Sequence, residues 1–563
     1  MKENKITGSE ALLRTLIAEG VECVFGYPGG QAIPIYDKLY EYKDKLRHVL
    51  VRHEQGATHA AEGYSRVSGK VGVVIVTSGP GATNTITGIA DAMLDSTPLV
   101  VITGQVPSPL LGTDAFQEVD VIGITQPITK WTYQVRRAED VAYAVSRAFY
   151  IASTGRPGPV VIDFAKDAQI GWVDYVYHPV DFIRSYRPWP KLEPERIQQA
   201  ADLINKAKRP FALVGQGVIL SGAEEELMTF LEKADIPAGT TMLGLSAMPS
   251  DYRLNKGMLG MHGNIGPNRK TSECDVLIAI GMRFDDRVTG DVNTFAKQAK
   301  VIHLDIDLSE MDKNIKTDVK VVGNAKDTLR EITSLLKPAK HTKWIDSFKA
   351  DEREERSKVI EKEIHPHSGL LRMGEVIRKV SEATGHEAVL VTDVGQNQVM
   401  SARYFKFSRT RSMVTSGGLG TMGFGLPAAI GAKIGAPDRT VCLFVGDGGM
   451  QMTLQELGTI MQENLNIKII ILNNHFLGMV RQWQEMFFQG RYSFTKMENP
   501  DFVAIAKAFK MGARGVKKRE ELGEAINEML HYPGSFLLVA EVEQFGKVYP
   551  MVPAGSCISK MIY

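Results

Sequence analysis

Two strand-like segments near the C-terminus end in side chains that could bind a metal ion. Thr440–Val445 runs into Asp447, which lies among glycines, and Ile467–Leu472 runs into Asn474, with a helical pattern between them. Because such a βαβ unit brings the carboxyl ends of its strands to one edge, Asp447 and Asn474 should emerge together beside a helix N-terminus. Oxygen ligands there suit Mg²⁺ with phosphate oxygens, although Gly-Asp-Gly alone also fits a tight turn.

The elements that position these residues fall into three stretches of alternating strand-like and helical pattern. Residues 1–181, 190–338 and 365–563 are each predicted to form an α/β domain with a doubly wound parallel sheet. Phe182–Pro194 contains several prolines and is predicted to be a linker. The charged segment 340–367 favours a solvated helix and connector over a partner-binding tail.

The strand predictions rest on short runs of β-branched and apolar residues bounded by glycine, proline or acidic residues. They are residues 21–26, 48–54, 71–79, 98–104 and 158–164 in the first stretch, 211–220, 236–243, 276–284 and 301–307 in the second, and 388–395, 440–449, 467–474 and 535–542 in the third.

Composition excludes several classes of protein. A chain of 563 residues is too long for a single small binding module. With 66 Lys and Arg against 65 Asp and Glu, the formal charge of +1 lacks the basic excess of a nucleic-acid binder. The 4 cysteines form no CxxC pair, which argues against a disulfide framework or structural zinc and favours a reducing, cytoplasmic setting.

Membrane association is not expected either. The apolar runs are strand-length, well short of the roughly 18 residues that a membrane span needs. The N-terminus has no apolar h-region or cleavage site and runs into an amphipathic helix pattern, so we expect the start of a mature domain.

A set of motifs spread over the chain then carries a family resemblance. The motifs are FGYPGG at Phe25–Gly30, HEQGA at His53–Ala57, TSGPGATN at Thr77–Asn84, SGGLGTMGFGLPAAIG at Ser416–Gly431, GDGG at Gly446–Gly449, LNN at Leu472–Asn474 and PMVPAG at Pro550–Gly555. The chain resembles acetohydroxyacid synthase, also called acetolactate synthase, specifically the catalytic large subunit of the biosynthetic, FAD-containing type. That family belongs to the thiamine diphosphate enzymes.

The resemblance implies a role for Glu54, which matches the glutamate facing the aminopyrimidine ring of thiamine diphosphate. A carboxyl group on the ring nitrogen favours the imino tautomer that removes the thiazolium proton. Without the resemblance, Glu54 would be read as an acid at the positive end of the following helix.

The same resemblance implies the other contacts of thiamine diphosphate and Mg²⁺. Metal contacts fall on Asp447, Asn474 and the backbone carbonyl of Phe476. Met422 matches the apolar residue that holds the cofactor bent, where an isolated methionine would be core filler. The remaining cofactor contacts are Tyr27, Pro80, Asn84, Val394, Gly395, Gln396, Asn397, Gly420, Gly448, Gly449 and Met479. GDGG and His475-Phe476 depart from the commoner family pattern.

FAD is implied by the middle stretch, where Gly281–Gly290 resembles a segment that flavin-free catabolic relatives lack. The implied contacts are Arg156, Gly215, Gly217, Met261, His262, Gly281, Arg283, Asp285, Arg287, Asp305, Asp318 and Val319. As raw sequence, Gly215–Leu220 is a weak fingerprint and Asp305 could be a strand terminator. In this family the flavin has no net redox role in the main reaction.

The implied reaction is decarboxylation of pyruvate and ligation of its two-carbon unit to pyruvate or 2-ketobutyrate, the first common step of branched-chain amino-acid biosynthesis. Arg287 is the candidate partner of the acceptor carboxylate, unless it pairs with Asp285 or Asp286. Trp483 matches the residue that packs on the extra methyl of 2-ketobutyrate, with a core tryptophan as the alternative. Gln117 and Lys166 match polar residues near the substrate entrance.

Partners follow from the resemblance alone. It implies a homodimer, or a tetramer, with each active site between the first domain of one subunit and the last domain of the other, and a possible small regulatory subunit. No nucleic acid and no membrane are expected. The alternatives are a pyruvate oxidase, a glyoxylate carboligase, a catabolic acetolactate synthase, or a noncatalytic protein of the same fold. Glu54 disfavours the glyoxylate carboligase, and the presence of Glu54 and Asp447 disfavours the noncatalytic protein.

Overall fold

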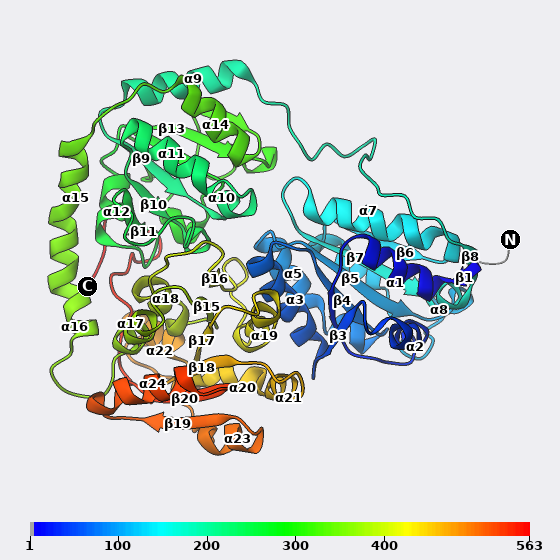
Figure 1. Ribbon diagram of the computed structural model, residues 1–563. Helices are drawn as coiled ribbons and strands as arrows, with labels where there is room; N and C mark the ends of the chain where they lie inside the picture. Colours follow the sequence, from blue (N-terminus) through cyan, green and yellow to red (C-terminus); the bar gives the residue numbers. More distant parts are fainter. Residues whose placement is uncertain (1–4) are drawn as a thin grey trace.

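Three parallel six-stranded sheets follow one another along the chain in the computed structural model, which describes residues 5–563 (Figure 1). The first sheet has the order β3 (Arg47–Leu50), β2 (Cys23–Gly26), β4 (Gly72–Val76), β5 (Leu99–Gln105), β7 (Pro159–Ala165) and β6 (Trp131–Val135). The third has the order β16 (Met413–Val414), β15 (Val389–Thr392), β17 (Val441–Gly446), β18 (Ile467–Asn473), β20 (Phe536–Glu541) and β19 (Gly512–Val516). The two sheets therefore share one strand order.

The middle sheet is wound differently. Its order is β11 (Asn255–Met258), β10 (Ala238–Thr240), β9 (Pro210–Val214), β12 (Val276–Ile280), β13 (Lys300–Asp305) and β14 (Val319–Val322). The order reverses between β9 and β12, and in open α/β sheets the crevice at such a switch point is where ligands bind. A short antiparallel pair, β1 (Lys5–Thr7) with β8 (Trp172–Asp174), completes the strands described.

These results confirm the predicted fold class, an α/β protein with three doubly wound parallel sheets. Central strands such as β4 and β18 are buried at every position, because helices cover both faces of each sheet. The sheets span residues 23–165, 210–322 and 389–541. The outer domain boundaries at 1–181, 190–338 and 365–563 stay predictions.

The first and third units meet through two helices, α3 (Glu54–Ser68) and α19 (Gly425–Gly435). A Cβ added at Gly63 would lie 2.0 Å from the Ala428 carbonyl oxygen, and one at Gly431 would lie 1.7 Å from that of Ala60. Only glycine permits this close approach of the two backbones.

The two segments that connect the units, residues 182–194 and 340–367, differ in structure. No helix or strand lies in residues 182–193, and α9 (Pro194–Lys206) begins at the next residue. This agrees with the predicted linker. Helix α15 (Thr342–Glu355) confirms the predicted helix, but one face is not solvated, since Trp344 and Phe348 are buried. Its Glu355 carboxylate accepts hydrogen bonds from Arg403 in the third unit and Asn264 in the middle unit.

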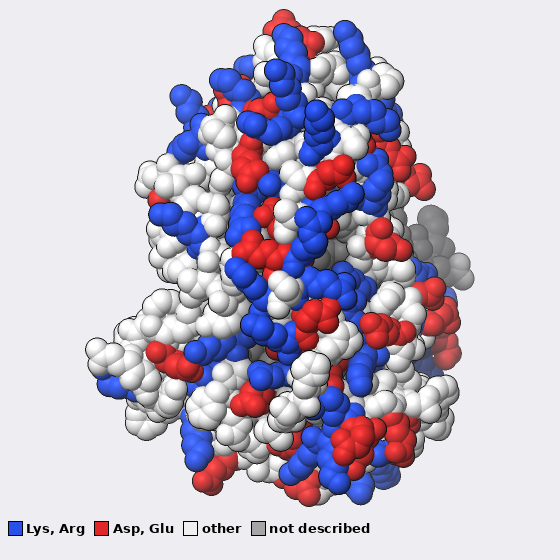
Figure 2. All heavy atoms as spheres, turned by 90° about the vertical axis from the view of Figure 1, so that its left-hand side faces the viewer, with Lys and Arg blue, Asp and Glu red and all other residues white. Residues whose placement is uncertain are grey.

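Charges on the surface are mixed in sign. Figure 2 shows basic and acidic side chains interspersed over one side of the molecule, the side on which α15 lies in Figure 1. Several form ion pairs, such as Arg269 with Asp351 at 2.8 Å. Within residues 5–563, no helix combines the length and apolar character needed to cross a bilayer.

Candidate active site

The carboxyl edge of the first sheet gathers the predicted residues of the N-terminal unit. Tyr27 follows β2, Glu54 follows β3, Pro80 and Asn84 lie in or beside α4 (Pro80–Thr83) after β4, and Lys166 follows β7. The Asn84 side-chain amide donates to Glu54 Oε2 at 2.9 Å. The loop after β5 brings the Gln117 carbonyl to 2.9 Å from the position that a Cβ on Gly79 would take. The predicted residues of this unit thus follow five strands of one sheet edge.

Glu54 is not the cap of its helix. The His53 side chain caps α3 by accepting from the Gln55 backbone N–H at 3.2 Å. Within the described chain, the only side-chain hydrogen bond of the Glu54 carboxylate comes from Asn84. Glu54 is the first residue of α3, so its place also agrees with the alternative of an acid at the positive end of this helix.

The predicted metal ligands lie at the carboxyl edge of the third sheet, where β17 and β18 pair in parallel. Asp447 opens α20 (Asp447–Met452), so Gly-Asp-Gly starts a helix and is not a simple turn. Asp447 and Asn474 are 1% and 3% exposed. His475 between the other two ligands has φ 58°, a left-handed conformation that turns the chain sharply, and the Phe476 N–H donates to Asn474 Oδ1 at 3.1 Å.

Open space adjoins these ligands. A Cβ on Gly395, Gly420 or Gly446 would meet nothing closer than 3.5 Å, and Gly395 and Gly420 have φ of 119° and 72°. Among residues 5–563, the buried Asn397 Oδ1 has no hydrogen-bond partner. Gly449, by contrast, packs tightly, since its Cβ would lie 2.3 Å from Asp393 Oδ1. The same edge carries Val394 and Gln396 after β15, Met422 after β16, and Gly448 and Met479 beside the ligands.

A cavity of about 620 Å³ opens at the switch point of the middle sheet and reaches the third sheet. Predicted FAD contacts that line it are Arg156, Gly217, Met261, His262, Gly281, Arg283, Asp285, Arg287 and Asp305. Burial raises the pKa of Asp305 to about 7 and lowers that of His262 to about 4. Gly215 serves packing, because its Cβ would lie 2.2 Å from the Gly281 carbonyl oxygen.

Besides Gly215, two predicted FAD contacts are absent from the cavity lining. Asp318 and Val319 lie where β14 begins, and Asp318 Oδ2 accepts from the Val301 backbone N–H at 2.9 Å, at the amino edge of the sheet. The cavity is lined instead by the residues after β14, Gly323–Ala325. The general rule that ligands bind at carboxyl ends of parallel strands could have pointed to them.

Sequence reasoning missed further lining residues from the other units. Leu94 and Ser96 come from the first unit, and Gly417–Leu419 from the third. Ser96 Oγ accepts from Arg156 Nε at 2.9 Å, and Arg156 also pairs with Glu310 at 2.7 Å. Leu94 ends α5 (Ile86–Leu94), Ser96 lies in the loop after it, and Gly417–Leu419 belong to the glycine-rich motif Ser416–Gly431. Only the assembly of the three units brings them to one cavity.

The predicted substrate residues Arg287 and Trp483 line the same cavity, as does Met479. The Arg287 side chain is 58% exposed, and its guanidinium lies 3.8 Å from the carboxylate of Asp286, which is 80% exposed. Arg287 is therefore not held in a buried ion pair. Asp285 Oδ1 accepts from the Arg287 backbone N–H, not from its guanidinium. Trp483 is 37% exposed and is therefore not a core tryptophan.

The cavity lining includes no residue of the Glu54 group: Tyr27, Glu54, Pro80, Asn84, Gln117 and Lys166 are all absent from it. Within residues 5–563, no hydrogen bond or ion pair joins the Glu54 carboxylate to Asp447 or Asn474. Within the described residues, the Glu54 group is therefore joined to Asp447 and Asn474 neither by this cavity nor by a direct hydrogen bond.

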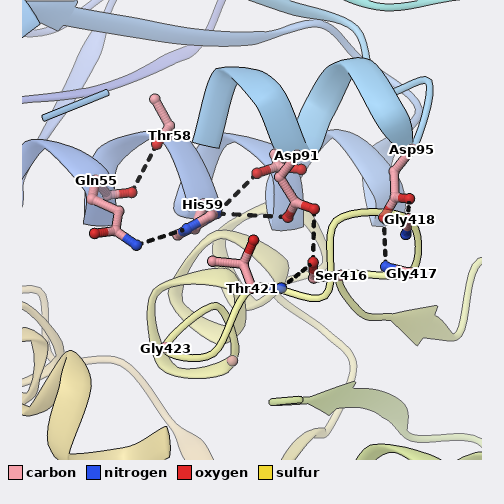
Figure 3. A network of polar contacts seen from close by, with 12 residues as sticks. Gln55, Thr58, His59, Asp91, Asp95, Ser416, Gly417, Gly418, Thr421 and Gly423 are labelled. Atoms are coloured by element: carbon pink, nitrogen blue, oxygen red, sulfur yellow. Dashed lines mark hydrogen bonds and ion pairs between the residues drawn. The ribbon is translucent and has the colours of Figure 1, made fainter. Parts of the chain in front are cut away.

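A buried polar network holds the first unit against the loop that carries Gly420 and Met422 (Figure 3). Asp91, on α5 (Ile86–Leu94), accepts from the Ser416 hydroxyl at 2.7 Å. Asp95, just after α5, accepts from the Gly417 and Gly418 backbone N–H groups at 2.8 and 2.7 Å. Ser416 Oγ in turn accepts from the Thr421 N–H at 2.8 Å. Burial, with the charges of Glu62 and Asp95, raises the pKa of Asp91 to about 8.

Replacing Asp91 with asparagine should change how stability depends on pH. An aspartate whose pKa is raised in the folded state contributes stability that is present at low pH and is lost as the pH rises through about 8. Asparagine imitates the neutral form at every pH and still accepts from Ser416. The free energy of unfolding of wild type should therefore fall relative to Asp91→Asn between about pH 5 and 8, by at most about 1.4 kcal/mol per pH unit. Denaturant titrations measure this difference, and the exposed Asp438→Asn serves as control. Parallel profiles for wild type and Asp91→Asn would refute the neutral buried carboxyl.

Comparisons with known proteins agree with this architecture. Three family descriptions match: "Thiamine pyrophosphate enzyme, N-terminal TPP binding domain" at residues 6–124, the central domain at 197–332, and the C-terminal TPP binding domain at 393–540. The chain is 45% identical to the acetolactate synthase large subunit of Corynebacterium glutamicum, over 99% of this chain and 90% of the relative.

Two further relatives come from other organisms. The isozyme 2 large subunit of Escherichia coli acetolactate synthase is 43% identical, covering 99% of both chains. A probable acetolactate synthase large subunit of Methanocaldococcus jannaschii is also 43% identical, over 99% of this chain and 95% of the relative. With all three domains matched and such identity over nearly the whole length, the chain belongs to the thiamine pyrophosphate enzymes and, among them, to the family of acetolactate synthase large subunits.

Proposed function

We propose that this chain is a catalytic subunit that joins pyruvate to a second 2-ketoacid with release of CO₂. Two pyruvates yield 2-acetolactate, and pyruvate with 2-ketobutyrate yields 2-aceto-2-hydroxybutyrate. The observation that carries the proposal is the arrangement of the first and third sheets. They share one strand order, and one presents Glu54 at its carboxyl edge while the other presents Asp447 and Asn474.

Thiamine diphosphate and Mg²⁺ fit the donor set of the third sheet. Asp447, Asn474 and the Phe476 carbonyl are oxygen ligands of the kind that Mg²⁺ takes, and the cation leaves positions for diphosphate oxygens. The open space beside Gly395, Gly420 and Gly446 suits a diphosphate close to the backbone. Asn397 Oδ1, unpartnered and buried, offers an acceptor that a ligand donor or water would satisfy.

FAD fits the cavity at the middle sheet. A volume of about 620 Å³ lies within the range of cofactor sites, and the lining mixes apolar residues with Arg156, Arg283 and Asp305. Arginines suit the pyrophosphate of a dinucleotide, while an acid that ends a strand suits a ribose hydroxyl. Asp318 and Val319 have no part in this proposal.

Bound thiamine diphosphate would supply the carbon nucleophile and the electron sink for decarboxylation. Glu54, steadied by Asn84, would hydrogen-bond the pyrimidine nitrogen and hold a proton there. Arg287 would bind the acceptor carboxylate as a planar fork, and Trp483 would pack against the acceptor's alkyl group. Gln117 and Lys166 would lie at the entrance on the Glu54 side.

The assembly proposed is a homodimer, or a tetramer built from dimers, in which Glu54 of one subunit faces Asp447 of the other. The separation of the Glu54 group from the cavity within one chain supports this. The relatives are named large subunits. We therefore extend the proposal to a small regulatory subunit as a further partner.

The test of function is an assay of the purified chain with pyruvate, thiamine diphosphate and Mg²⁺, with and without FAD. Acetolactate, measured as acetoin after acid treatment, is expected only when FAD is bound. Oxygen uptake in place of acetolactate would instead support a pyruvate oxidase. Acetolactate from flavin-free protein would support a catabolic synthase.

Replacing Arg287 with alanine should weaken use of the acceptor more than binding of the cofactors. Loss of charge-assisted hydrogen bonds worth about 1.5–3 kcal/mol predicts a fall of about 10- to 100-fold in kcat/KM for the acceptor. Competition between pyruvate and 2-ketobutyrate measures it, with Arg330→Ala, an exposed arginine outside the cavity, as control. An unchanged acceptor dependence would remove Arg287 from this role.

A further inference from the structure

One asparagine outside every motif above contacts the predicted metal ligand Asp447. Asn499 lies 52 residues further along the chain, yet its side-chain amide donates to Asp447 Oδ2 at 2.6 Å. The same nitrogen donates to Asn473 Oδ1 at 2.8 Å. Asn473 ends β18 directly before Asn474, so Asn499 links the two strand ends that carry the side-chain ligands.

The orientation of the Asn499 amide is determined by its neighbours. Gln451 Nε2 donates to Asn499 Oδ1 at 3.0 Å, which directs the Asn499 nitrogen toward Asp447. On the other side, the Asn473 amide donates to Glu541 Oε1 at 2.8 Å, and an ionised carboxylate can only accept. The Asn473 oxygen therefore faces Asn499. Both amide protons of Asn499 have acceptors, and the side chain cannot flip without losing them.

The segment before Asn499 is also attached to the ligand loop. Leu477 N–H donates to the Thr495 carbonyl at 2.8 Å, and Met497 N–H donates to the His475 carbonyl at 2.9 Å. Phe476 and Lys496 form an antiparallel bridge between these bonds. Residues 495–499 thus form a strap that pairs with the loop bearing Asn474 and Phe476 and reaches Asp447 through Asn499.

We propose that Asn499 is a positioning residue for the cation, and that it acts by holding Asp447 in one orientation. Because the Asn499 amide engages Asp447 Oδ2, Oδ1 is the oxygen left for the cation. The strap also fixes the position of Asp447 relative to the loop ligands Asn474 and Phe476. Such outer partners of metal ligands commonly contribute about 10- to 100-fold to metal affinity. The inference rests on the proposed function, since it takes Mg²⁺ with thiamine diphosphate as the occupant of this edge.

The test is the melting temperature of the full chain against MgCl₂ concentration, with thiamine diphosphate in excess. Ligand binding to the folded state raises the melting temperature, and the concentration at which the rise occurs reports affinity. Asn499→Ala should require about 10- to 100-fold more Mg²⁺ than wild type, while the melting temperature without Mg²⁺ changes little. Turnover of Asn499→Ala should return at saturating MgCl₂, which a merely structural defect would not allow.

Asn466→Ala is the matched control. Asn466 lies directly before Ile467, at the end of β18 opposite to Asn473, and its side-chain amide donates to the Pro533 carbonyl at 3.3 Å. The Asn466→Ala variant should therefore need the same Mg²⁺ concentration as wild type. If Asn499→Ala fails to fold, Gln451→Ala is the second variant. It removes the donor to Asn499 Oδ1, together with a hydrogen bond to the Asp447 backbone carbonyl at 3.2 Å, and should shift the Mg²⁺ requirement less, in the same direction. A folded variant of either kind with wild-type Mg²⁺ dependence overturns the inference. No Mg²⁺-dependent rise in wild type would overturn the proposed function as well.

Discussion

Glu54→Gln should lower kcat for acetolactate formation by roughly 100- to 10,000-fold at saturating thiamine diphosphate and Mg²⁺. Glutamine has the shape of glutamate and can still meet Asn84, but it cannot hold an acidic proton on the cofactor ring. Because the His53 side chain caps α3, the variant should keep the melting temperature of wild type. Steady-state kinetics and a thermal melt measure the two quantities separately.

An exposed glutamate of the same unit provides the control. Glu41 forms a surface ion pair with Lys38 at 2.7 Å and lies outside the site, so Glu41→Gln should retain activity. Near-full acetolactate formation by Glu54→Gln would remove Glu54 from the proton transfer.

Two inactive variants should restore one another's activity when their chains assemble together. Asp447→Ala removes the only carboxylate ligand of the proposed Mg²⁺ site, and Glu54→Gln removes the proton-holding group of the other half. If each site joins the first unit of one chain to the third unit of its partner, a hybrid dimer has one site with both defects and one with neither. Hybrids purified through two different affinity tags should show about half the wild-type activity, because a two-fold dimer has two equivalent sites.

The control for this experiment pairs two defects in the same half. A hybrid of Glu54→Gln with Glu54→Ala has no intact site in either arrangement and should stay inactive. Verified hybrids of Glu54→Gln with Asp447→Ala that remain inactive would show that each site is completed within one chain. In that case the units of one chain would have to move relative to one another, so that Glu54 reaches the cavity of its own chain.

The strands predicted from sequence are the interior ones, with β3 as the only edge strand among them. In the three six-stranded sheets, the missed strands are β6, β11, β14, β16 and β19, and all of them lie at sheet edges; the short pair β1 and β8 was missed as well. An interior strand is covered by helices on both faces and paired on both sides, which demands a continuous apolar run. An edge strand has one neighbour and tolerates polar residues and glycine, as in Asn255–Met258 and Gly512–Val516.

Site predictions divided along a similar line. Asp447 and Asn474 follow strong interior strands, so a rule about the carboxyl edge was enough to expect them together. Asp318 and Val319 rested on resemblance, and β14, the edge strand that begins with Val319, was not recognised. Without that strand, its amino end could not be distinguished from its carboxyl end, where Gly323–Ala325 line the cavity.

The sequence by itself determined the α/β class, the interior strands and the polar residues at their ends, because these depend on periodicity and on neighbours along the chain. Only the tertiary structure decided which loops line the cavity, that Asn499 reaches Asp447, and that Glu54 stays apart from the cavity in one chain. Such contacts join residues far apart in sequence. They depend on how whole helices and sheets pack against one another, and no local pattern records that packing.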